Sequence, residues 1–110
     1  MKPVRMHVPQ DLGELLDLAS SMMLLAPTFE DITGYLPFKN LDYVFQQLHE
    51  GLDRNRRELG EERYQELVRI AGEMRTLFKA DPETKTGETL EGYKKIVEME
   101  GILKAAMRKA

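Results

Sequence analysis

The chain has 110 residues, of which 42% are hydrophobic and 32% charged, proportions typical of one globular domain. It contains no cysteine, which excludes disulfides, thiolate metal sites and cysteine nucleophiles. The formal net charge of −3 argues against nucleic acid as a partner, because nucleic-acid-binding proteins gain much of their affinity from basic side chains that neutralise phosphates.

Hydropathy argues against a membrane protein. No stretch reaches the roughly 20 consecutive apolar residues of a membrane-spanning helix. The most apolar segment, residues 15–26, is interrupted by Asp17, Ser20 and Ser21 and follows acidic residues, so it makes a poor signal peptide. We expect a cytoplasmic protein.

The first helix is expected after an extended N-terminal arm, residues 1–9, which carries two prolines. The helix begins at Gln10 or Asp11 and ends before Pro27, because proline does not continue a helix. Its apolar residues recur at spacings of three and four, as they do on one face of an α-helix.

A longer irregular connection, residues 27–39, follows, since a glycine and a proline prevent a long helix there. The second helix opens at Asn40, a residue type that suits an N-cap, and Gly60 stops it. Gly51 leaves open whether this helix is split, because glycine weakens a helix interior.

Two longer helices complete the chain, over residues 61–79 and residues 88–108, with a hydrophilic loop between them. Gly72 and Gly101, inside these helices, are either tolerated positions or points of close helix–helix approach. The last helix is apolar on two flanks. Its predicted core face comprises Leu90, Tyr93, Ile96, Val97, Leu103 and Met107, and its second flank Met99, Ile102 and Ala106.

Together these elements predict an all-α fold. We expect a compact four-helix bundle-like single domain over residues 10–110, with the longer irregular loop between its first and second helices. No segment shows the strict alternation of a half-buried strand.

No catalytic, metal or cofactor site is expected, and therefore no enzyme activity. His49 and Asp53 share a helix face, as metal ligands at i and i+4 do, but the sequence offers no third ligand. The other histidine, His7, falls in the arm. There is no nucleophile elbow around a serine and no glycine-rich phosphate loop.

Aromatic residues cluster around the irregular connection, where five of the eight lie between residues 29 and 45. They either fold down and cap the bundle or anchor a partner, since interfaces enrich aromatic side chains ringed by polar groups. Two adjacent methionines would add adaptable apolar surface. The candidate partner-binding residues are Met22, Met23, Phe29, Asp31, Tyr35, Phe38 and Tyr43.

A second candidate site is a charged patch formed by Arg54, Arg56 and Arg57. Acidic neighbours cancel these charges, which favours a solvated junction with exposed ion pairs. Contact with an acidic partner or with RNA is the alternative.

We therefore expect a small acidic protein-interaction module: a regulator, adaptor or inhibitor, including the kind that neutralises a basic toxin. Its negative charge would steer a basic partner protein. One alternative is a structural homo-oligomer, such as a homodimer, that associates through the aromatic loop or the double-sided last helix. Another is a weak nucleic-acid binder that uses the three arginines.

Overall fold

The computed structural model describes residues 7–29 and 40–109, and within them the chain is helical without a strand. The all-α prediction is confirmed. The helices are α1 (Leu12–Leu25), α2 (Leu41–Arg54), α3 (Arg56–Leu59), α4 (Glu61–Ala80) and α5 (Glu88–Lys109).

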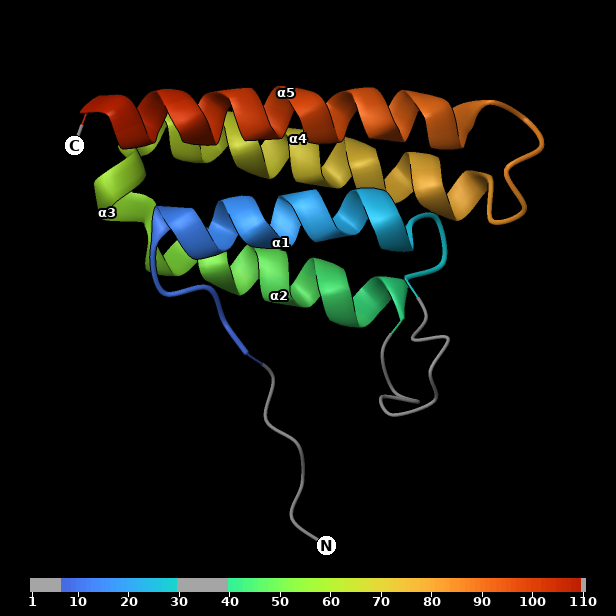
Figure 1. Ribbon diagram of the computed structural model, residues 1–110, viewed down its shortest axis with the longest axis horizontal. Coiled ribbons are helices and arrows are strands. Elements are labelled where there is room, and N and C mark those ends of the chain that lie inside the picture. Colours follow the sequence, from blue (N-terminus) through green and yellow to red (C-terminus); the bar gives the residue numbers. More distant parts are fainter. Residues whose placement is uncertain (1–6, 30–39, 110) are drawn as a thin grey trace, which may run out of the picture.

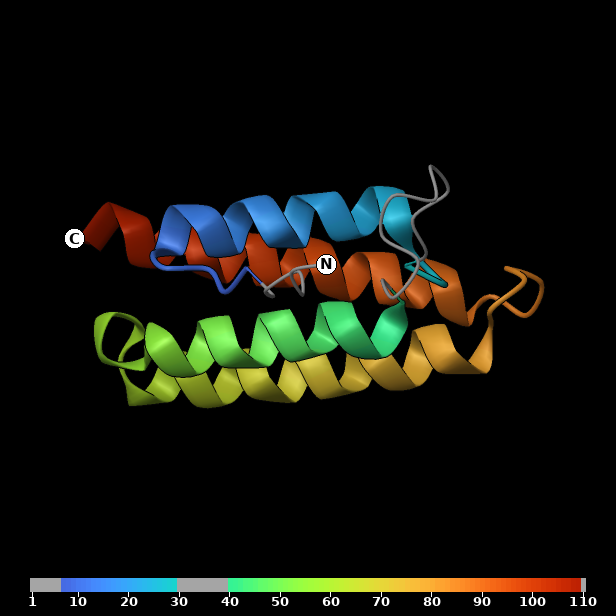
Figure 2. The ribbon, with the colours of Figure 1, turned by 90° about the horizontal axis from the view of Figure 1, so that it is seen from below.

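Four of these helices form a bundle, as the sequence predicts, and their topology is up-down-up-down (Figure 1). Each long helix runs antiparallel to the two helices beside it, and the order around the bundle is α1, α5, α4, α2. The α4–α5 and α1–α5 contacts are extensive, whereas α1 and α2 touch over a smaller area. The single turn α3 closes the end of the bundle between α2 and α4 (Figure 2).

Side-chain caps set the starts of α1 and α2. The Asp11 carboxylate accepts a hydrogen bond from the backbone N–H of Glu14 at 2.8 Å, and the Asn40 side chain accepts one from Tyr43 at 2.9 Å. Both predicted starts are therefore confirmed. Each cap satisfies a backbone donor that has no partner within the first turn of its helix.

The second helix does not break at Gly51; it continues to Arg54, and the chain bends at Asn55. The prediction that Gly60 ends this helix was wrong, because Gly60 follows the short helix α3 instead. The Asn55 side chain is buried and donates to the backbone carbonyls of Gly51 and Pro9. A Cβ at Gly51 would lie 2.9 Å from carbon atoms of Leu15 and Pro9. Gly51 therefore serves close packing inside an intact helix.

A cluster of three aromatic rings lies within the hydrophobic core. Phe29 meets the rings of Phe45 and Phe78 edge-on, with centroids 5.6 Å and 5.4 Å apart. Edge-to-face contact of this kind adds to the gain from burying the rings. The described chain just after α1 thus closes one end of the core.

The core face of α5 differs from the predicted one. Leu90, Val97 and Met107 are exposed, so their assignment to the core was wrong. The buried positions recur at spacings of three and four: Thr89, Gly92, Ile96, Met99, Leu103 and Ala106. Thr89 is polar and Gly92 has no side chain, so neither contributes to a hydrophobic pattern. The pattern therefore predicted a neighbouring stripe of α5 as the core face.

The close approach between helices also occurs at a different glycine. A Cβ at Gly92 would lie 2.4 Å from the Phe78 ring, so this glycine leaves room for the aromatic cluster. Gly72 and Gly101 have open space at that position, and neither marks a helix contact. Within the described residues no helix combines the length and apolar character needed to cross a membrane.

Candidate partner-binding groove

The structure assigns two of the candidate partner-binding residues to the core. Phe29 and Met22 are fully buried, so the prediction that they form an exposed contact surface was wrong. The reason is tertiary: the chain turns back after α1 and places Phe29 against the ends of α2 and α4. For this residue, the capping interpretation is the correct one.

The remaining candidates divide between half-buried and undescribed positions. Met23 and Tyr43 are half-buried and pack against the core. Asp31, Tyr35 and Phe38 lie outside the described residues.

The three arginines of the charged patch lie at the end of the bundle where α2 meets α3, and they have different surroundings. Arg54 donates to the Gln10 side chain at 2.8 Å, which ties the segment before α1 to α2. Arg57 is exposed and has no hydrogen bond or ion pair with any other described residue. Arg56 belongs to a polar cluster with α4.

In that cluster, Arg56 donates two hydrogen bonds to the Glu61 carboxylate, at 2.8 Å and 2.6 Å. These bonds, and one from Gln65, lower the pKa of Glu61 to about 2. The Arg56 guanidinium also stacks 4.2 Å from the centre of the Tyr64 ring. A hydrogen bond to Asp53 raises the pKa of Tyr64. Arg56 is thus held by its own chain.

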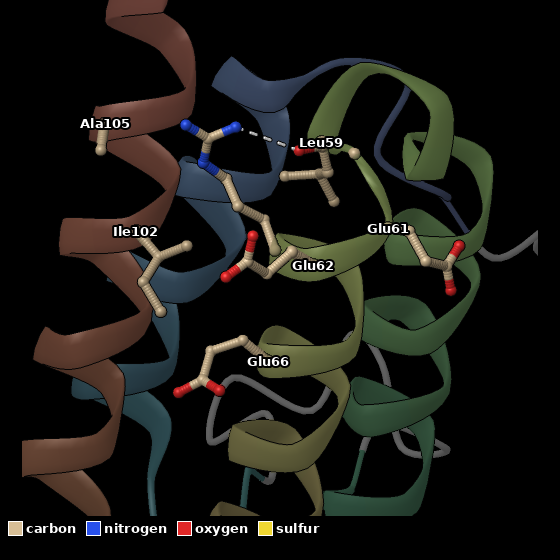
Figure 3. A pocket seen from close by; sticks show the side chains of 8 residues that line it. Leu59, Glu61, Glu62, Glu66, Ile102 and Ala105 are labelled. Carbon is tan, nitrogen blue, oxygen red and sulfur yellow. Dashed lines mark hydrogen bonds between the residues drawn. The ribbon is translucent and has the colours of Figure 1, made fainter.

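A groove of about 570 Å³ lies between the start of α4 and the C-terminal part of α5 (Figure 3). A volume of this size suits a ligand or a few side chains of a partner. Its lining residues are Leu59, Gly60, Glu61, Glu62, Arg63, Glu66, Ile102 and Ala105.

The groove combines an apolar wall with an acidic wall. Ile102 lies on the side of α5 next to α4, and Glu62 and Glu66 project from α4 towards α5 (Figure 3). Ala105 lines the groove from the exposed side of α5. Ile102 is half-buried and Ala105 is exposed, so partner atoms can reach both side chains. The spacing of 62 and 66 puts both carboxylates on one face of α4, one turn apart.

The carboxylates in the groove differ in their pairing. Glu66 forms an ion pair with Arg69, which lies one turn further along α4. Glu62 has no hydrogen bond or ion pair with any other described residue. Arg63, the single basic lining residue, donates to the Leu59 carbonyl at 3.2 Å and so caps the end of α3. Three carboxylates and one arginine line the groove, and Glu62 is the carboxylate among them that has no partner within the described residues.

The sequence indicated parts of this groove without joining them. Ile102 stood out on the second apolar flank of the last helix, and the acidic residues at the start of α4 suit the helix dipole. Residues 62 and 102 are 40 positions apart, and only the packing of α5 on α4 brings them together.

The described residues contain no group of three or more histidine and acidic side chains arranged to hold a metal ion. His49 is half-buried on α2, and His7 contacts Glu14 at 2.9 Å. Comparisons with protein-family models, with curated proteins and with solved structures found no match.

Proposed function

We propose that this protein is a small acidic interaction module of the cytoplasm, without enzyme activity, which binds a basic segment of another protein. The proposal rests on the groove between α4 and α5, where an apolar wall faces carboxylates and one of these, Glu62, has no partner among the described residues. Such a module acts as a regulator, as an adaptor or as an inhibitor of a basic protein.

The groove suits a lysine or arginine side chain. Such a side chain has a long aliphatic stem and a charged head, and it gains most where apolar and acidic surfaces adjoin. The stem would lie on Ile102 and Ala105, and the head would reach Glu62 and Glu66. The net charge of −3 would also speed the approach of a basic partner, more so at low salt.

Selection from a displayed library of random peptides on the immobilised chain tests this function. We expect enrichment of peptides that carry basic residues beside apolar ones, and weaker binding as salt is raised. Enrichment of acidic or uncharged peptides, or no enrichment at all, would contradict the proposal.

A charge reversal then locates the binding site. Glu62→Lys should weaken binding of a selected peptide about tenfold or more, a loss of about 1.4 kcal/mol. The control is Glu50→Lys, which makes the same charge change at an exposed position of α2 and should alter binding less than about twofold. Equal effects of the two variants would show that net charge, and not the groove, determines binding.

A further inference from the structure

Two neighbouring helices carry the exposed large apolar side chains. Among the described residues, the large hydrophobic side chains with high exposure all belong to α1 or α5: Leu24 (87%), Leu90 (59%), Val97 (55%) and Met107 (40%). These two helices lie side by side (Figure 1). Exposed apolar side chains concentrated on one side of a molecule are typical of an interaction site.

One hydrogen bond sets the register of this surface. The Ser20 hydroxyl of α1 donates to the Glu100 carboxylate of α5 at 2.8 Å. Because the helices are antiparallel, Leu24, one turn after Ser20, lies level with Val97, which is about one turn before Glu100. Asp17 lies about one turn before Ser20, and Lys104 lies about one turn after Glu100. These two residues are therefore also level with each other, towards the other end of the bundle.

These four residues form two stripes, which we call the α1/α5 face. Asp17 and Leu24 are seven residues apart on α1, and Val97 and Lys104 are seven residues apart on α5, so each pair shares one side of its helix. All four are exposed. Neither Asp17 nor Lys104 has a hydrogen bond or ion pair with another described residue.

We propose that the α1/α5 face binds a second copy of this chain. A twofold axis that runs parallel to the helices lays α1 of each copy on α5 of the other. Leu24 then meets Val97 of the second copy, and Asp17 meets Lys104 of the second copy, each contact occurring twice. Apolar side chains are buried together and opposite charges are paired.

A twofold axis that is perpendicular to the helices, and lies within the face midway between its two levels, gives poor contacts. This axis exchanges the two ends of the face. Leu24 and Val97 of one copy would then lie against Asp17 and Lys104 of the second copy. Charged groups would then lie against apolar side chains, which costs free energy. When both levels of the face are in contact, the pattern of the face therefore favours the parallel axis.

The size of the face sets the strength expected of the dimer. The face is about 33 Å long, which is the length of the 22 residues of α5. Its width is that of two helices, α1 and α5, whose axes lie about 10 Å apart. The surface covered on each copy is therefore somewhat smaller than the roughly 800 Å² of a standard interface. We expect a dissociation constant in the micromolar range.

Sedimentation equilibrium of the full chain tests the dimer. We expect a monomer–dimer equilibrium up to about 200 μM, and about tenfold weaker association for Asp17→Lys and for Lys104→Asp. An equimolar mixture of the two variants should restore association, because each places opposite charges against the other. Gln46→Lys, at an exposed position of α2, is the control and should dimerise as the unaltered chain does.

A chain that stays monomeric at these concentrations would overturn the dimer. So would variants that associate unchanged, or a mixture in which association is not restored. The dimer is independent of the proposed function, because the groove lies on the side of α5 that faces α4. If the chain dimerised but bound no basic peptide, only the proposed function would be contradicted. If it stayed monomeric but bound basic peptides, only the dimer would be contradicted.

Discussion

Individual residues decide how tightly the helices of this bundle approach one another. Gly92 lies on the buried side of α5, opposite the fully buried Phe78 ring. Phe78 in turn packs against Phe29 and Tyr93, so it has little freedom to move aside. An added methyl group at residue 92 must displace a ring that is held on several sides.

We expect Gly92→Ala to lower the free energy of unfolding by about 1–3 kcal/mol, the usual cost of overpacking a core. The control is Gly72→Ala on α4, where the new Cβ meets open space. That variant should raise stability by about 0.5–1 kcal/mol, because alanine favours a helix over glycine. Urea denaturation measures both, and equal changes would contradict the close contact at Gly92.

Phe29 offers a second test at this scale. Its ring is fully buried, so Phe29→Ala should cost about 3–5 kcal/mol through lost burial and the cavity that remains. Leu90→Ala, at an exposed position, should change stability by less than about 0.5 kcal/mol. If denaturation gave a small loss for Phe29→Ala, the ring would not be part of the core.

At the scale of the element, the start of α5 depends on a single buried carboxylate. Asp81 accepts backbone hydrogen bonds from Lys85 at 2.6 Å and from Thr86 and Thr89 at 3.1 Å each. The Thr89 hydroxyl donates in turn to the Asp81 backbone carbonyl at 2.9 Å. Asp81 thus joins the end of α4 to the first turn of α5.

Burial opposes ionisation of Asp81, but the hydrogen bonds from Thr89, Thr86 and Lys85 outweigh it and hold its pKa well below the ordinary 3.8. The charged form therefore stabilises the folded chain. Its contribution is complete above the unfolded pKa and is lost as the pH falls through the folded pKa.

We expect Asp81→Asn to lower the urea midpoint near neutral pH. Both carboxylate oxygens accept backbone N–H groups, whereas an amide would place its NH₂ against one of these donors. The difference from the unaltered chain should stay constant down to about pH 4 and shrink below it, because Asp81 of the unfolded chain takes up a proton there while Asp81 of the folded chain is still charged. A difference that stayed constant with pH would show that its charge does not matter.

At the scale of the whole molecule, the four long helices form a closed ring in which each helix packs against two others. The core residues belong to one connected hydrophobic cluster that includes parts of every helix. A single core of this size usually unfolds in one cooperative step.

We therefore expect coincident denaturation curves from far-ultraviolet circular dichroism, which reports helix, and from tyrosine fluorescence, which reports packing. The tyrosines suit this comparison because Tyr43, Tyr64 and Tyr93 belong to α2, α4 and α5. Two separated transitions would show instead that part of the ring, such as the smaller α1–α2 contact, opens independently.

The sequence by itself determined the four long helices and their order. Caps such as Asp11 and Asn40, and apolar residues at helical spacing, act over a few neighbouring residues, so they are visible without the fold. The acidic character and the lack of cysteine were likewise plain from composition.

Only the tertiary structure decided which stripe of α5 faces the core and which residues form surfaces. Thr89 and Gly92 are buried because Asp81 and Phe78 lie against them, and hydrophobicity does not report either contact. Phe29 is buried in the core, and Glu62 and Ile102 line the same groove, because distant parts of the chain pack against one another. Such contacts depend on how whole helices rotate against one another, which no local pattern specifies.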